Sequence, residues 1–244
     1  MRLVIDIGNT RTKIAVFSSS TLFLVEVYDN ITVDDIKNII KRFPTIRKSI
    51  YSSVADADSV KTEIQDYLKQ NTKLINMNQD LSYPIINHYL SPKTLGKDRL
   101  AGVIGAKSLF AEDDCLVIDS GTCITIDFID KSNNYYGGSI SPGIKMKYKA
   151  LNTFTESLPL INEKFQKEDI IGTDTQGSIN SGVLNGTIME LQGFIRYYSS
   201  NYPDIKILFT GGDSRYLQSY FKKNTILEEH LVLLGLNIIL DTNA

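Results

Sequence analysis

The chain of 244 residues has little of the side-chain chemistry that many enzymes and metal sites use. It contains two cysteines, Cys115 and Cys123, which are too few for a disulfide scaffold or a four-ligand zinc site. It also contains two histidines, His88 and His230, so a histidine-based metal site has little support. We therefore expect its chemistry to depend on carboxylates, hydroxyls, backbone amides and bound ions.

The sequence also lacks an excess of charge and a long apolar run. The net charge is −2, so there is no general field that would gather DNA or RNA, and we expect no nucleic-acid partner. The longest apolar stretch, residues 231–240, is interrupted by Asn237 and is shorter than the roughly 20 residues that span a bilayer. No targeting segment is visible. We expect a cytoplasmic protein with no membrane partner.

What is present is an α/β pattern that occurs twice. Hydrophobic residues make up 42% and charged residues 22% of the chain, which indicates a globular protein with a sizeable core. Residues 4–8 resemble residues 117–121 at an offset of 113, and Thr12 maps onto Thr125 at the same offset. Chance similarity over nine positions is the alternative. An internal repeat of a half-chain predicts two related α/β lobes.

The hydrophobic periodicity predicts strands and helices in a similar order in both halves. In the first half, we expect strands over 2–5, 13–17, 22–28, 49–54 and 74–77, and helices over 33–42 and 56–70. In the second half, we expect strands over 116–119, 123–129, 135–140 and 205–210, and helical regions over 172–198, 213–221 and 228–240. The predicted lobes are residues 1–112 and residues 113–244.

The turn after the first predicted strand has the chemistry of a phosphate-binding loop. Successive backbone N–H groups in a sharp turn can form a nest for phosphate oxygens, and Mg²⁺ prefers carboxylate, water and phosphate oxygen. An ordinary β-hairpin with a Gly-Asn turn is the alternative. The candidate phosphate-binding residues are Asp6, Ile7, Gly8, Asn9, Thr10, Arg11, Thr12 and Lys13.

Two further turns in the second half add to this pattern. Asp119 and Thr122 belong to an Asp-Ser-Gly-Thr turn that repeats the logic of the first motif. Gly211 and Gly212 follow a predicted strand and precede a predicted helix, which allows a flat ligand to approach the backbone and the helix amides. Gly-Gly also occurs in plain turns, so this pair is a weak signal by itself.

The order of these three turns resembles the acetate kinase, sugar kinase, Hsp70 and actin superfamily, in which they surround ATP. Three further segments are Gly-Lys-Asp-Arg at 96–99, Gly-Gly-Ser-Ile-Ser-Pro-Gly at 137–143 and Asp-Thr-Gln-Gly-Ser-Ile-Asn-Ser-Gly at 174–182. Together these motifs resemble type III pantothenate kinase. The resemblance implies two related lobes of the actin-like ATPase (ribonuclease H-like) type, each a mixed five-stranded sheet with flanking helices, and an ATP cleft between them.

The resemblance also implies an activity: ATP-dependent phosphorylation of pantothenate to 4'-phosphopantothenate, the first step of coenzyme A biosynthesis. It makes Asp98 the general base that accepts the proton of the attacking hydroxyl during a direct in-line transfer. It places Asp6 at Mg²⁺ on the ATP phosphates, Asp119 at a potassium or ammonium ion, and Thr122 at ATP. The implied pantothenate contacts are Tyr89, Gly96, Lys97, Asp98, Arg99 and Thr175, the last from the neighbouring subunit of a homodimer.

Each of these assignments has a structural alternative. Asp98 and Arg99 could simply begin a helix near Gly96, because acidic residues are favourable in a first turn. Tyr89 could be a packing residue, and Thr175 could be a helix N-cap. Two alternative functions also stay open: another enzyme of the superfamily, such as a phosphatase or a different small-molecule kinase, and a regulator that binds ATP without consuming it.

Overall fold

The computed structural model describes residues 1–53, 59–77, 80–162, 168–221 and 225–244. The chain divides into two compact units. The first contains Met1–Ala111, Asn133–Tyr135 and His230–Ala244, and the second contains Glu112–Ser132 and Tyr136–Glu229. The predicted lobes were residues 1–112 and residues 113–244. In the structure, the C-terminal helix lies in the first unit, with the N-terminal part of the chain.

The first unit is built on a five-stranded sheet with the order β3-β2-β1-β4-β5. Its strands are β1 (Arg2–Ile7), β2 (Thr12–Ser18), β3 (Thr21–Tyr28), β4 (Lys48–Ser53) and β5 (Lys73–Asn76). β1 is antiparallel to β2 and parallel to β4, so the sheet is mixed, as expected. All five expected strands are present; Val54, at the end of one of them, lies outside the described residues.

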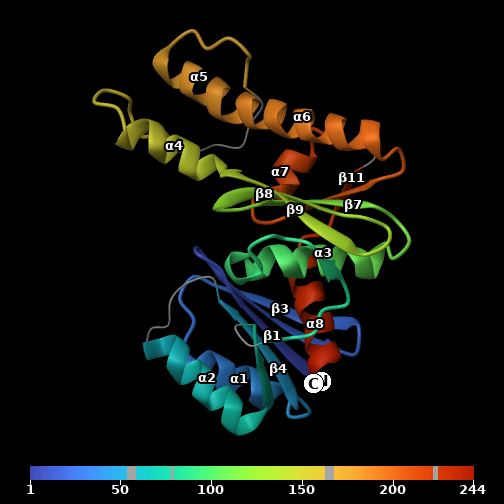
Figure 1. The fold of residues 1–244 in the computed structure, drawn as a ribbon. Helices are drawn as coiled ribbons and strands as arrows, with labels where there is room; N and C mark the ends of the chain where they lie inside the picture. Colours follow the sequence, from blue (N-terminus) through green and yellow to red (C-terminus); the bar gives the residue numbers. More distant parts are fainter. Residues whose placement is uncertain (54–58, 78–79, 163–167, 222–224) are drawn as a thin grey trace. The chain divides into compact units, whose positions relative to one another are not determined.

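Helices cover both faces of this sheet (Figure 1). On one face, α1 (Val33–Arg42) and α2 (Ser59–Asn71) pack on Leu3, Ile5 and Ile7 of β1. Because successive side chains of a strand point to opposite faces, Val4 and Asp6 lie on the other face. The start of the expected helix over 56–70 lies outside the described residues.

The other two long helices of the first unit, α3 (Lys97–Leu109) and α8 (Leu231–Asn243), cross at very close range. A Cβ atom at Gly235 would lie 1.8 Å from the carbonyl oxygen of Ala101, and one at Gly105 would lie 2.3 Å from that of Leu231. The two backbones can therefore meet only because both positions are glycine. This contact fixes α8 to α3, whose first turn contains Asp98.

The second unit repeats the strand arrangement of the first, in the order β11-β10-β7-β8-β9. β7 is antiparallel to β8 and parallel to β10, as β1 is to β2 and β4. A sixth strand, β6, pairs with Asn134 and Tyr135, so this sheet has six strands where we expected five. The strands are β6 (Ile86–Asn87), β7 (Cys115–Ser120), β8 (Cys123–Ile129), β9 (Asn134–Pro142), β10 (Lys206–Thr210) and β11 (Thr225–Leu227).

The repeat has one irregularity, in the turn of the hairpin. Asp6 pairs with Lys13 across β1 and β2, whereas Asp119 pairs with Thr125 across β7 and β8. Thr125 is therefore the equivalent of Lys13, and the predicted match between Thr12 and Thr125 is wrong. The reason is that residues 8–11 join the last pair of the first hairpin and residues 121–123 join that of the second, so the second turn is one residue shorter.

Four helices lie on one side of the second sheet (Figure 1): α4 (Ile144–Thr153), α5 (Thr175–Asn180), α6 (Gly186–Asn201) and α7 (Ser214–Gln218). Their buried residues, including Ile144, Ile179 and Leu191, pack on Leu116 and Ile118 of β7. A π-helical turn, η2 (Ser181–Asn185), joins α5 to α6. A short 3₁₀ helix, η1 (Pro92–Thr94), precedes α3 in the first unit.

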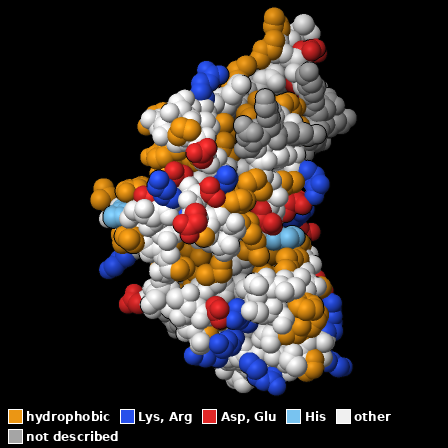
Figure 2. All heavy atoms as spheres, turned by 90° about the vertical axis from the view of Figure 1, so that its right-hand side faces the viewer, with side chains coloured by type: hydrophobic (Ala, Val, Ile, Leu, Met, Phe, Trp, Pro, Cys, Tyr) orange, Lys and Arg blue, Asp and Glu red, His pale blue; other side chains and the backbone are white. Residues whose placement is uncertain are grey.

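The surface is of mixed character. On the face drawn in Figure 2, acidic and basic side chains both occur, in keeping with the net charge of −2. Hydrophobic side chains also reach this surface in several places. None of the helices among the described residues has the length and apolar character needed to cross a membrane.

Candidate active site

The turn between β1 and β2 is a tight loop with an exposed tip. The N–H of Gly8 donates to the carbonyl oxygen of Arg11 at 3.1 Å, which closes the loop. Asn9 and Thr10 are exposed at the tip, where a ligand can reach them. The guanidinium of Arg11 lies 3.3 Å from the carboxylate of Asp29 in an exposed ion pair. The side chain of Arg11 is thus paired with Asp29 at the surface.

Asp6 lies at the end of β1 with a buried carboxylate oxygen. Its Oδ1 has no hydrogen-bond partner among the described residues. Burial, and then the nearby negative charge of Asp98, raise the pKa of Asp6 from 3.8 to about 6, although Lys13 acts in the opposite direction. Two carboxylates that repel each other, one with an unpartnered oxygen, are an arrangement that a cation would stabilise.

The raised pKa of Asp6 makes a prediction about stability in the absence of ligand. The folded state holds the proton more tightly than the unfolded state, so the free energy of unfolding should fall as the pH rises from about 4 to about 6. The loss should be on the order of 1–3 kcal/mol. Asp6→Asn should remove it, which urea unfolding at a series of pH values can measure. Parallel pH profiles for the two proteins would contradict the assignment.

The carboxylates of Asp6 and Asp98 fit a metal ion that binds together with a phosphate ligand. Within the described ranges, no group of three or more His, Cys, Asp and Glu side chains could hold a metal ion. Mg²⁺ usually takes only one or two protein carboxylates and completes its shell with water and substrate phosphates. The unpartnered oxygen of Asp6, beside Asp98, fits this mode of binding.

Asp98 lies in the first turn of α3, where its position depends on a glycine. The N–H of Arg99 donates to Oδ1 of Asp98 at 2.9 Å. A Cβ atom at Gly96, the N-cap residue, would lie only 2.5 Å from the same oxygen. Asp98 and Arg99 do lie in the first turn of a helix that begins after Gly96, which was the alternative to a catalytic role. The charge of Asp98, however, also raises the pKa of Asp6, so the two motifs act on each other within the first unit.

Arg99 and Tyr89 form a second contact next to Asp98. Arg99 is 7% exposed, and its guanidinium carbon lies 5.5 Å from the centre of the Tyr89 ring. One guanidinium nitrogen lies 3.5 Å from the Tyr89 hydroxyl. This geometry is a cation–π contact with a weak hydrogen bond. The structure therefore brings together the predicted residues Tyr89, Asp98 and Arg99, with Lys97 half-buried beside them.

In the second unit, the two predicted turns lie side by side because β7 and β10 are parallel neighbours. Asp119 pairs with Thr210, and the N–H of Asp213 donates to the carbonyl oxygen of Ser120 at 2.9 Å. Gly211 has a φ of +94°, and a Cβ atom there would lie 2.4 Å from Oδ1 of Asp119. Only glycine fits this position, both for its backbone conformation and for its closeness to Asp119.

A third segment, the string over residues 137–143, reaches the same place. The N–H of Gly143 donates to the carbonyl oxygen of Thr122 at 3.1 Å. A Cβ atom at Gly143 would lie 2.2 Å from the carbonyl oxygen of Gly121, and one at Gly138 would lie 1.7 Å from that of Ile126. The sequence identified this string only as a family motif. The structure shows that its glycines allow β9 to lie against β8 and against the turn that contains Thr122.

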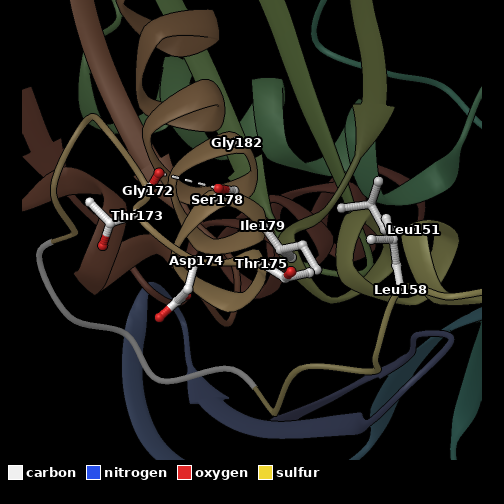
Figure 3. A pocket seen from close by; sticks show the side chains of 9 residues that line it. All are labelled: Leu151, Leu158, Gly172, Thr173, Asp174, Thr175, Ser178, Ile179 and Gly182. Atoms are coloured by element: carbon white, nitrogen blue, oxygen red, sulfur yellow. Dashed lines mark hydrogen bonds between the residues drawn. The ribbon is translucent and has the colours of Figure 1, made fainter.

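Thr175 lies elsewhere in the second unit, at an open pocket of about 610 Å³. Figure 3 shows the residues that line the pocket: Leu151, Leu158, Gly172, Thr173, Asp174, Thr175, Ser178, Ile179 and Gly182. The N-cap of α5 is Asp174, whose carboxylate accepts from the N–H of Gly177 at 2.7 Å, so Thr175 is not the cap. Thr175 is exposed at the first position of the helix, and its hydroxyl is accessible to a partner or ligand.

The sequence profile of the type III pantothenate kinase family matches residues 2–197. The chain belongs to this family. The type III pantothenate kinase of Christiangramia forsetii is 42% identical over 244 residues, which is 100% of this chain and 99% of that protein. The predicted family is therefore confirmed.

Solved structures with lower identity confirm the fold. A protein from Campylobacter jejuni, described as a Baf family transcriptional activator, has a TM-score of 0.62 at 23% identity, over 98% of this chain and 97% of that one. A protein from Listeria monocytogenes, described as an N-acetylmannosamine kinase, has a TM-score of 0.54 at 11% identity, over 98% of each chain. The chain thus has the α/β fold of the actin-like ATPases and sugar kinases.

Proposed function

We propose that this protein phosphorylates pantothenate at its primary hydroxyl with ATP, in the cytoplasm, as the first step of coenzyme A biosynthesis. The observation that carries the proposal is the 42% identity to a type III pantothenate kinase over the whole of both chains. The effect of the Asp98 charge on Asp6, which has one buried carboxylate oxygen, supports it, because phosphoryl transfer needs a proton acceptor close to a cation site.

In this proposal, Asp98 is the general base. Phosphoryl transfer passes through a loose transition state, so the protein contributes mainly by positioning groups and neutralising charge. The carboxylate of Asp98 is oriented by the N–H of Arg99, which donates to its Oδ1. It would accept the proton of the pantothenate hydroxyl late in the transfer, as that oxygen bonds to the γ-phosphorus and the bond to ADP breaks.

The pantothenate carboxylate would bind at the start of α3. Arg99 suits this role because a guanidinium can grip a carboxylate with two parallel hydrogen bonds. Its position on the Tyr89 ring limits the conformations it can adopt. Gly96 and Lys97 complete this group, with Gly96 leaving the space that Asp98 occupies. We assign these residues to substrate binding.

The residues that we assign to ATP are those of the predicted turns. In our assignment, residues 6–13 and Thr122 contact the phosphates, and Gly211 and Gly212 lie against the adenosine. Mg²⁺, bound through the phosphates and Asp6, would supply positive charge that neutralises the transferring group. From the family resemblance, we assign Asp119 to a monovalent cation, potassium or ammonium.

We also propose that the protein is a homodimer in which Thr175 completes the partner's site. Large apolar side chains are exposed around α4, α5 and α6 in the second unit: Phe154 (85%), Ile171 (75%), Ile170 (61%), Leu160 (58%) and Met189 (55%). A contiguous patch of such side chains would be typical of an interaction surface. The partner would be a second copy of the chain, whose pantothenate site Thr175 would complete.

Mixing two inactive variants tests this sharing of residues between subunits. After subunit exchange, a dimer of one Asp98→Asn chain and one Thr175→Ala chain would have one site with both defects and one site with neither. The rate of ADP release should therefore rise above that of either variant alone. If the mixture never exceeds the mean of its two components, Thr175 acts within its own subunit or not at all.

The activity is tested by ADP release from the purified protein with ATP and Mg²⁺. We expect release to depend on pantothenate, and to be lost when sodium replaces potassium. If ATP turns over only with other hydroxyl compounds, the protein is another kinase of the superfamily. If ATP binds and is not consumed with any acceptor or cation, the regulatory alternative replaces this proposal.

A further inference from the structure

The position of Tyr89 is determined by a short strand pair that the sequence did not predict. Asn87 of β6 is in register with Tyr135 of β9, and the N–H of His88 donates to the carbonyl oxygen of Tyr135 at 2.9 Å. The N–H of Tyr89 then donates to the side-chain oxygen of Asn87 at 2.9 Å. The backbone of Tyr89 is thus attached to the start of β9 through β6 and this side-chain hydrogen bond.

The ring of Tyr89 is held by the same residue of β9. The rings of Tyr89 and Tyr135 are stacked, with centres 6.3 Å apart and planes 15° from parallel. Tyr135 is fully buried and is among the largest fully buried side chains of the protein, so its ring is fixed by the surrounding core. Arg99 contacts the Tyr89 ring in turn, at 5.5 Å from its centre. The three side chains form a series from the core to the substrate site, all within the first unit.

We propose that Tyr135 is a positioning residue for pantothenate, acting through Tyr89 on Arg99. This inference rests on the proposed function. Arg99 has a long side chain, and holding it in one conformation before the substrate arrives reduces the entropy that binding would otherwise cost. Removing the Tyr135 ring would leave the Tyr89 ring free to move, and the guanidinium would lose its support.

The test is steady-state kinetics of the full chain with varied pantothenate. Tyr135→Leu should raise the KM for pantothenate by about two- to tenfold, the range expected for one aromatic stack, with a smaller change in kcat. The KM for ATP should not change. Tyr135→Phe keeps the ring and should restore the wild-type KM. Phe17→Leu, a similar loss of a buried ring in the same unit, should lower the melting temperature without raising the KM.

A double-mutant cycle separates positioning from a general loss of packing. If Tyr135 acts through Tyr89, Tyr135→Leu should have no further effect on the KM for pantothenate in a Tyr89→Leu background. An equal rise in both backgrounds would overturn the proposal, and so would an unchanged KM in folded Tyr135→Leu protein. A wild-type protein without pantothenate-dependent ADP release would instead overturn the proposed function, and this inference with it.

A second variant covers the case in which Tyr135→Leu does not fold. Asn87 is exposed, so Asn87→Ala should leave folding intact while it removes the hydrogen bond to the N–H of Tyr89. It should also raise the KM for pantothenate. Asn38→Ala, at an exposed position on α1, is the matched control and should not. Equal KM values for the two variants would count against the proposal.

Discussion

Asp98→Asn is expected to lower kcat by about 10²–10⁴-fold while the protein stays folded. Asparagine has the shape of aspartate, and its side-chain oxygen can still accept the N–H of Arg99, so the start of α3 should be unchanged. What is lost is the ability to accept a proton from the attacking hydroxyl. Because binding groups are left in place, we expect a much smaller change in the KM for pantothenate.

The control for this prediction is an aspartate that has no contact with the site. Asp66 on α2 forms an exposed ion pair with Lys69 at 3.1 Å, so Asp66→Asn should keep the wild-type kcat. Rates of ADP release, together with circular dichroism and a melting curve for each variant, provide the comparison. A folded Asp98→Asn protein that retains more than about a tenth of the wild-type kcat would exclude a base at this position, because general-base catalysis contributes more than that.

The elements that the sequence predicted well are those determined by local interactions. The helix α1 was expected over 33–42 and occupies the same residues. It begins at a capping box, in which Thr32 and Asp35 satisfy each other's backbone N–H groups, and its buried residues Ile36 and Ile39 follow helical spacing. β8 was likewise expected over the residues it occupies, because it directly follows the Asp-Ser-Gly-Thr turn.

The features that could not be predicted depend on contacts between distant residues. β6 has two exposed residues and no apolar pattern, and it exists only because Asn134 and Tyr135 pair with it. The grouping of α8 with the first unit follows from its close contact with α3, to which no local signal points. The alternative that Thr175 is the N-cap of α5 could be excluded only by the structure, since Asp174 and Thr175 are both good capping residues and the backbone decides between them.

The same distinction holds for the candidate site. The motifs containing Asp6 and Asp119 could be found in the sequence from their turn residues, and the segment containing Asp98 from its resemblance to the family. The effect of Asp98 on the pKa of Asp6 could not be found, because it requires β1 and α3 to be placed in space. The contribution of Tyr135 was missed for a similar reason: it is one of thirteen tyrosines, and only its stacking on Tyr89 sets it apart.

Gly235→Ala, on α8, is expected to lower the stability of the protein strongly. The added carbon would lie 1.8 Å from the Ala101 carbonyl oxygen and 2.6 Å from its carbonyl carbon, and neither belongs to a flexible side chain. The helices must therefore move apart, and overpacking of this kind costs about 1–3 kcal/mol or more. Because α3 carries Asp98 in its first turn, the same movement should lower kcat even where the protein remains folded.

The matched control for Gly235→Ala is Gly193→Ala on α6. Both substitutions favour the helix, since alanine is a better helix former than glycine by about 1 kcal/mol, but a Cβ atom at Gly193 meets no atom within 4 Å. Gly193→Ala should therefore raise the melting temperature slightly, whereas Gly235→Ala should lower it by several degrees or more. Equal melting temperatures would mean that α3 and α8 can separate at little cost, and the position of Asp98 would then have to be fixed by the contacts of Gly96 and Arg99 instead.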